Sequence, residues 1–438
     1  MVLMKTSILN NIDSKLGIYG YSTNFLGIGG KIKKSFTDFK VEELINPIIS
    51  SSITEKPSST NIYPIFKLVK EGVDTIHAVK NIKKNLGWDV NYLGLKDKKA
   101  QTIQYISPKR LKNDLANNIQ ITKNISLEFY GFYSNIITRK DLVGNHFSIK
   151  IRDIQCDPEN LKKAFRELEQ KIKNMKIPNF YGYQRFGSKR PINHTIGKAI
   201  VKRQFEKAVT IILSQLDEDN KSVTDDCKET IRNINILQKF KKNQDIEKRV
   251  LKSIFMHPNN WIAAIRSVPL TVRRLYIQAY QSFIFNRVMS KAAYLDISLF
   301  KIENGDIFGV LNQENGTISE IRRSSDKIKM YKERNKFPLV QIVGYTFKKG
   351  IGRFDQLIEE VLEEENISPK LFYNKELSEL SMAGGFRIPP LLVNDLEISV
   401  DVKDTFSSTI QFSLLKGSYA TILLRELIKP VNPIASGF

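Results

Sequence analysis

Strand-like segments at both ends of this chain, with long helical patterns between them, constrain its fold more than any other feature. Polar and apolar residues alternate over 147–152 near one end and over 396–402 and 409–414 near the other, as half-buried strands require. The middle instead carries helical patterns over 196–216 and 272–293. Because strands from both ends can share one sheet, we expect the middle of the chain to be a domain inserted within another domain.

The length of the chain supports this division, because 438 residues exceed the usual size of a single domain. We predict an α+β protein of mixed α/β character. Residues 1–179 and 389–438 form its discontinuous first domain, and residues 180–388 form the insertion. The segment 46–64, rich in Ser, Thr and Pro, is expected to be a flexible loop, and the charged segment 217–249 a surface excursion.

Helix-opening signals add detail to the first domain. Asp74 stands at the N-cap position of a helical pattern over 75–86, and Asp157 with Pro158 opens a second helix. Shorter strand signals occur at 39–42 and 65–69. These segments predict a sheet with helices packed against it.

The charge of the chain points to an anionic partner. Lys and Arg total 68 against 46 Asp and Glu, which gives a formal net charge of +22. Nucleic acid is the partner that an excess of this size favours. The alternative is a basic protein whose charge serves solubility alone, because charge by itself specifies neither fold nor chemistry.

Several other function classes are disfavoured. The two cysteines, Cys156 and Cys227, form no CxxC pair, and the four histidines are scattered without the spacing of metal ligands. We therefore expect no metal site and no zinc-dependent deaminase chemistry. The start of the chain lacks the apolar region of a signal peptide, and no apolar run is long enough for a membrane span. A cytoplasmic protein without a membrane partner is expected.

Asp97 is the candidate catalytic residue. Residues 90–93 have strand character, Gly94 interrupts them, and strand character resumes over 101–107, so Asp97 is expected on a connection between two strands. Lysines at 96, 98 and 99 surround it and would keep its carboxylate ionised, as covalent attack on carbon requires. The same lysines could hold the phosphates of a nucleotide. The alternative is an ordinary charged turn.

The segment from Gly94 to Gln104 resembles the signature of the TruD family of tRNA pseudouridine synthases. Further segments resemble elements of that family in the same order: Lys33 ahead of Thr37-Asp38-Phe39, Gly144-Asn145-His146-Phe147, Asn179 to Gly187, and Gly417 to Thr421 followed by Arg425-Glu426-Leu427. Thr37 and Phe36 depart from the family, in which many members have Glu and Pro there. The ordered set covers nearly the whole chain.

This resemblance implies a fold and a reaction. The fold is a pseudouridine synthase catalytic domain with a bent, largely antiparallel sheet, plus an inserted TruD-specific α/β domain. The reaction is the isomerisation of uridine to pseudouridine in tRNA, with position 13 as the expected target, and it uses no cofactor and no metal. tRNA is the expected partner, and a monomer is the expected form.

The resemblance also implies roles for individual residues. Asp97 would be the nucleophile and Lys33 its counterion. Phe147 would stack on the flipped-out uracil, Asn145 would orient the loop or the base, and Phe39 and Tyr419 would line the uridine pocket. Two alternatives remain open, namely that Lys33 is a surface lysine and that Phe147 packs in the core. If buried, the Tyr419 hydroxyl needs a hydrogen-bond partner.

Other cations are candidates for RNA contact. These residues are Lys96, Lys98, Lys99, Arg185, Lys189 and Arg190. The three in the segment 185–190 could instead hold the junction between the domains. A second hypothesis for the whole chain is a catalytically silent protein that binds or folds tRNA on the same scaffold.

Overall fold

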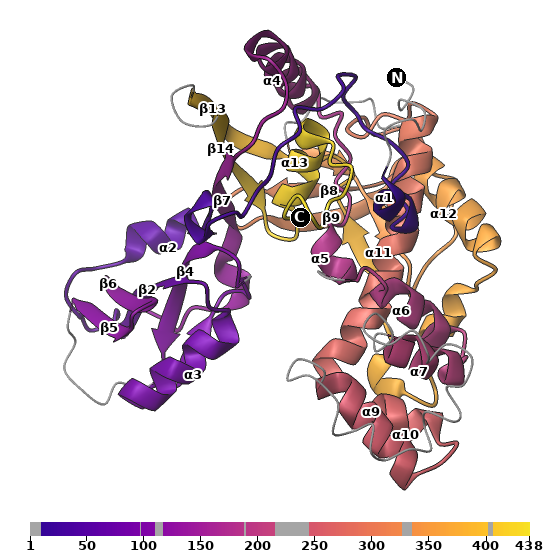
Figure 1. The fold of residues 1–438 in the computed structure, drawn as a ribbon, viewed down its shortest axis with the longest axis horizontal. Helices are drawn as coiled ribbons and strands as arrows, with labels where there is room; N and C mark the ends of the chain where they lie inside the picture. Colours follow the sequence, from indigo (N-terminus) through magenta and orange to yellow (C-terminus); the bar gives the residue numbers. More distant parts are fainter. Residues whose placement is uncertain are drawn as a thin grey trace.

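The structure is a computed structural model of the chain, and it describes residues 10–96, 98–109, 117–187, 190–214, 245–325, 335–401 and 406–438. Asp97 and Lys189 lie outside the described residues. The fold is α+β, as the sequence predicts. Figure 1 shows a lobe with the larger sheet and α3 on one side and a mainly helical lobe around α6 to α11 on the other.

Among the described residues, nine strands form one mixed sheet in the order β13-β14-β7-β1-β4-β2-β6-β5, with β3 beside β4. The pairing is antiparallel except between β1 and β4, so the expected largely antiparallel sheet is observed. The strands are β1 (Phe39–Ile45), β2 (Tyr63–Glu71), β3 (Val90–Tyr92), β4 (Gln101–Pro108), β5 (Asn118–Thr122), β6 (Ile125–Tyr133), β7 (Leu142–Ile151), β13 (Val393–Asp401) and β14 (Ser407–Leu415).

The register of the sheet brings distant residues into one row. Phe412 pairs with Phe147, Phe147 with Val41, Val41 with Thr102, and Thr102 with Lys70. Because cross-strand partners share a face of a sheet, these five side chains lie on the same face. This row runs across the centre of the sheet from β14 to β2.

Helices cover the two ends of that face and leave its middle to a loop. At one end, the helices α4 (Pro158–Lys173) and α13 (Ala420–Ile428) pack in one apolar cluster with Phe147 and Phe412. At the other, α3 (Thr75–Leu86) buries Ala78 and Ile82 against strand residues that include Phe66. The connection between β3 and β4 lies between these ends.

The caps explain why α3 and α4 begin where the sequence predicts. The Asp74 side chain accepts from His77 N, and α3 ends at Gly87, whose φ of 70° favours glycine. The Asp157 side chain accepts from the backbone of Glu159 and Asn160, with Pro158 in the first turn. Both N-cap predictions are confirmed.

The segment 180–388 also contains two small sheets. One contains β8 (Ile307–Asn312), β9 (Thr317–Arg323) and β10 (Lys336–Pro338), and the other pairs β11 (Val340–Ile342) with β12 (Gly385–Arg387). Its helices are α5 (Tyr183–Phe186), α6 (Asn193–Val201), α7 (Phe205–Leu213), α9 (Asp245–Met256), α10 (Trp261–Ser267), α11 (Leu270–Tyr294) and α12 (Arg353–Glu364). The nine-stranded sheet draws its strands from 39–151 and 393–415, and a continuous apolar cluster connects it to α11 and α12.

Three segment predictions differ from the structure. The helical pattern over 196–216 is divided into α6 and α7, because the chain turns at 202–204 and Arg203 adopts a left-handed φ of 61°. The expected loop 46–64 contains the helix α2 (Pro47–Ser52), which Asn46 caps and Pro47 opens. Residues 245–249 of the expected surface excursion begin α9, and 217–244 lie outside the described residues. Among the described helices, none is long and apolar enough to cross a membrane.

Candidate functional site

The loop between β3 and β4 is tied to the sheet through Lys96. The Lys96 Nζ lies 3.1 Å from Glu43 Oε1 and donates to Asn145 Oδ1 at 2.5 Å. Its backbone N–H donates to Thr75 Oγ1 at 2.9 Å. The Lys96 side chain is 10% exposed, so its charge is directed into the protein and is unsuited to a phosphate contact from the surface. This finding argues against the RNA-contact role predicted for Lys96.

Glu43 is the buried residue that holds Lys96. Its side chain is fully inaccessible, and its carboxylate accepts from Tyr105 N at 3.0 Å and from Gln104 Nε2 at 3.3 Å. A buried carboxylate is stable only when it is paired and hydrogen-bonded, and both conditions are met here. Gln104 also donates to Gly94 O at 2.8 Å, which fixes the start of the loop.

The end of the loop is anchored by the turn that follows β2. Gly72 N donates to Ala100 O at 3.4 Å, and Ala100 is buried. In the same turn, the fully buried Lys70 donates to Val73 O at 2.8 Å. Lys98 and Lys99 are exposed and remain candidates for RNA contact. The residues on either side of Asp97 are therefore held against the middle of the sheet face.

Three aromatic side chains adjoin this loop on the same face. Phe147 stacks on Phe412 with ring centroids 5.4 Å apart and meets Phe39 edge-on at 6.3 Å. Phe39 and Phe147 are 6% and 8% exposed, so most of each ring is packed against its neighbours. The Lys33 ammonium lies 4.5 Å from the centre of the Phe39 ring, in cation–π contact. Phe39, Lys33, Asn145 and Phe147 are thus brought together.

Gly144 explains why the Gly-Asn-x-Phe element begins with glycine. A Cβ at Gly144 would lie 2.1 Å from Leu414 O on the neighbouring strand β14. Such a contact is sterically forbidden, so a larger residue would push β7 away from β14. The glycine therefore sets the spacing of the strands beside Asn145.

Arg185 and Tyr419 meet at the junction between the lobes. Arg185 Nε donates to Tyr419 OH at 3.1 Å, and its NH1 donates to Gln278 Oε1 of α11 at 3.0 Å. The hydroxyl of the partly buried Tyr419 thus has a hydrogen-bond partner. Arg190 NH1 donates to Ser214 O at 3.0 Å. These contacts favour the junction role of Arg185 and an intramolecular contact for Arg190.

Arg387 is a junction residue that the sequence patterns did not reveal. Its guanidinium is buried 4.2 Å over the Tyr181 ring and donates to Asn179 O, Asn179 Oδ1 and Gly417 O at 2.9, 2.8 and 2.8 Å. Burial lowers the pKa of Arg387 below its usual range, and the neighbouring Tyr181 opposes that shift. The motif segments that begin at Asn179 and Gly417 therefore meet around one buried cation.

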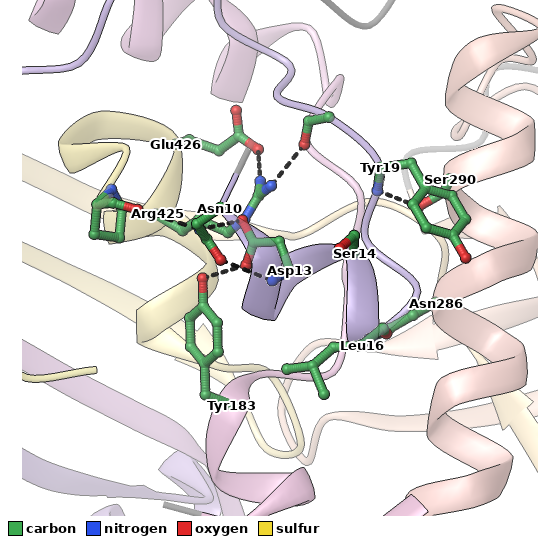
Figure 2. Close-up of polar contacts among 12 residues, drawn as sticks. Asn10, Asp13, Ser14, Leu16, Tyr19, Tyr183, Asn286, Ser290, Arg425 and Glu426 are labelled. Carbon is green, nitrogen blue, oxygen red and sulfur yellow. Dashed lines mark hydrogen bonds and ion pairs between the residues drawn. The ribbon is translucent and has the colours of Figure 1, made fainter. Parts of the chain in front are cut away.

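A second buried cluster joins the beginning of the chain to its end (Figure 2). Asp13, in α1 (Asn11–Lys15), accepts from Arg425 Nε at 2.8 Å and from Tyr183 OH at 2.6 Å. Arg425 NH1 also donates to Glu426 Oε1 at 3.2 Å. Burial alone would lower the pKa of Arg425, but Asp13 and its anionic neighbours raise it. The Arg-Glu-Leu motif therefore supplies the cation and an anion of this cluster.

The chain after α1 continues this connection to the helical lobe. Asn286 Nδ2 donates to Leu16 O at 3.1 Å, and Ser290 Oγ donates to Gly17 O at 2.8 Å, both from α11. The segment that holds Asp13 thus contacts α13 on one side and α11 on the other. It fixes the two lobes relative to each other.

The mixed sheet, the anchored loop and the motif segments define a chain of the pseudouridine synthase type. The family model described as tRNA pseudouridine synthase D (TruD) matches residues 15–427, so the chain belongs to the TruD family. A probable tRNA pseudouridine synthase D of Pyrobaculum aerophilum is 34% identical over 98% of this chain and 99% of its own length. The corresponding protein of Methanococcoides burtonii is 30% identical over 97% and 98%. The crystal structure of the putative tRNA pseudouridine synthase D from Methanosarcina mazei superposes with a TM-score of 0.77 at 26% identity and covers 98% of this chain and 99% of that one.

Proposed function

We propose that this protein isomerises uridine to pseudouridine in tRNA and that Asp97 is its nucleophile. The single observation that carries the proposal is the anchoring of the loop around residue 97. Lys96 is fixed by Glu43 and Asn145, in a member of the TruD family, on the sheet face that also carries Phe39 and Phe147.

The reaction needs no net exchange of atoms. In the proposed course, the Asp97 carboxylate adds to the uracil ring or to the ribose, and the glycosidic bond to N1 breaks. The base then turns, and a bond from C5 to the ribose carbon forms as the carboxylate is released. The C5 proton leaves and N1 takes up a proton, so uridine and pseudouridine contain the same atoms. Such covalent catalysis requires an ionised carboxylate and a gripped base. In this proposal, Lys33 keeps the carboxylate ionised. Phe39, Asn145 and Phe147 hold the base.

The order of the segments along the chain supports separate roles for two domains. We propose that residues 1–179 and 389–438 form the catalytic domain and that 180–388 form the inserted domain. Arg387, Arg185 and the Asp13 cluster would then set the angle between them. Lys98 and Lys99 are proposed contacts for tRNA phosphates, and the formal charge of +22 favours such binding. A monomer acting in the cytoplasm on position 13 of tRNA, without a cofactor, completes the proposal.

The test is to incubate the purified protein with unmodified tRNA transcripts and to map pseudouridine at single-nucleotide resolution. The proposal predicts one modified uridine, at position 13, in reactions without added metal or cofactor. A matched transcript with cytidine at position 13 serves as the control and should show no product. If the protein binds tRNA but forms no pseudouridine on any transcript, the silent RNA-binding function replaces this one.

A further inference from the structure

Lys96 determines which way the Asn145 amide faces. A lysine ammonium can only donate hydrogen bonds, so the Asn145 atom that lies 2.5 Å from it must be the carbonyl oxygen Oδ1. This assignment follows from chemistry and does not depend on telling the amide nitrogen from the oxygen by position. The Nδ2 amino group therefore points away from Lys96.

The Lys96 ammonium is itself fixed in place. It lies against Glu43, whose carboxylate is fully buried and is held by Tyr105 N and Gln104 Nε2. If the Asn145 amide turned over, its amino group would face a buried ammonium, and two donors would oppose each other. The chain Glu43 to Lys96 to Asn145 thus locks the amide in one orientation.

Asn145 remains partly exposed beside the aromatic cluster. It stands two residues before Phe147 on β7, so both side chains lie on the same face of the sheet. A base held against this face would meet the Asn145 amino group, which offers donors. Uracil carries the acceptor O4 where cytosine carries a donating amino group. A fixed donor accepts the first base and rejects the second.

We propose that Lys96 and Glu43 are positioning residues that hold Asn145 as a hydrogen-bond donor and so make the site select uracil over cytosine. This inference rests on the proposed function, because it assumes that the base binds at this face. It assigns Lys96 a role in base selection instead of phosphate contact. It also explains why a buried ion pair lies beneath the loop.

The experiment measures equilibrium binding of two tRNA transcripts that carry uridine or cytidine at the target position. The measurement uses the Asp97→Asn variant, because binding can then be compared without relying on turnover. We expect this protein to prefer uridine by about tenfold or more, as one good base-edge contact allows. If neither transcript is modified by the unaltered enzyme but the preference is present, the proposed reaction fails while this inference stands.

Two variants test whether the orientation of the Asn145 amide controls the preference for uridine. Asn145→Asp presents only acceptors and should abolish or reverse the preference for uridine. The double variant Lys96→Met with Glu43→Gln removes both charges together and frees the amide, so the preference should fall to within about threefold while both transcripts still bind through their phosphates. A merely structural role would weaken both transcripts equally and leave their ratio unchanged.

Lys99→Met is the matched control, since Lys99 is exposed on the same loop. It should weaken both transcripts by the same factor and leave the ratio unaltered. The inference is overturned if Asn145→Asp leaves the preference for uridine intact. It is equally overturned if the folded double variant keeps the preference of the background protein.

Discussion

Replacement of Asp13 by alanine should destabilise the protein far more than the removal of a surface carboxylate. Asp13 and Arg425 are both fully inaccessible, and the change leaves Arg425 without the carboxylate 2.8 Å from its Nε. Breaking a buried ion pair by removing one partner costs about 3–5 kcal/mol. Arg425 keeps Glu426 Oε1 at 3.2 Å and Gly20 O at 2.8 Å, which offsets part of the loss. We expect the free energy of unfolding to fall by about 4 kcal/mol.

This loss is measurable by urea denaturation followed through Trp88 and Trp261, which report on the larger sheet and on α10 respectively. A control is Glu159→Ala, whose pair with Lys163 is exposed to solvent and should contribute little to stability. Asp13→Asn keeps the shape of the side chain and removes its charge, so a large effect there would assign the loss to the ion pair. A decrease below about 1 kcal/mol for Asp13→Ala would refute the reasoning.

Two further predictions concern a buried imidazole and an aromatic ring. Burial lowers the pKa of His194 to about 4 from the usual 6.5, so the unfolded chain binds this proton first as the pH falls. The stability that His194 contributes is therefore complete above pH 6.5 and is lost towards pH 4, by about 2 kcal/mol at pH 5. Between about pH 7 and pH 5 the unaltered protein should therefore lose about 2 kcal/mol of urea stability that His194→Leu keeps, and equal losses in both proteins would contradict the shift. Phe147→Ala should cost about 3–5 kcal/mol of stability because its ring stacks on Phe412, and it should lower pseudouridine formation more than Phe147→Tyr does. Equal loss of activity in both variants, with unfolding, would leave Phe147 a packing role alone.

Local patterns predicted much of the sheet. The strand signals at 39–42, 65–69 and 147–152 fall within or overlap β1, β2 and β7, because alternation directly reflects which face of a strand is buried. Those patterns did not predict that β1 pairs in parallel with β4 while β2 lies on the other side of β4. Strand order depends on contacts between distant segments, and no local pattern contains that information.

The polar residues beneath the loop were missed, although one signal could have revealed them. Glu43 occupies the alternate position of β1 that Phe39 and Val41 share, so a carboxylate stands where the strand is buried. Such a residue requires a buried partner. Lys70 likewise occupies the alternate position of β2 that Phe66 and Leu68 share. The alternation of the two strands is therefore enough to identify both residues as buried charges.

The sequence could not show which lysines of the loop point into the protein and which are exposed. Lys96 points into the protein, whereas Lys98 and Lys99 are exposed, and all belong to one charged turn. The direction of each side chain depends on Glu43 and Asn145, which lie far away in the sequence. Similarly, the motif residue Arg185 is as compatible with RNA contact as with a junction until Tyr419 and Gln278 are placed beside it.

The central claim is tested most directly by single-turnover pseudouridine formation with Asp97→Asn. Asp395→Asn is the matched control, because Asp395 is exposed on β13 and asparagine tolerates its left-handed φ of 53°. We predict that Asp97→Asn binds tRNA and forms no detectable pseudouridine, while Asp395→Asn reacts at the rate of the unaltered protein. Product formation by Asp97→Asn at an undiminished rate would contradict the assignment of Asp97 as the nucleophile.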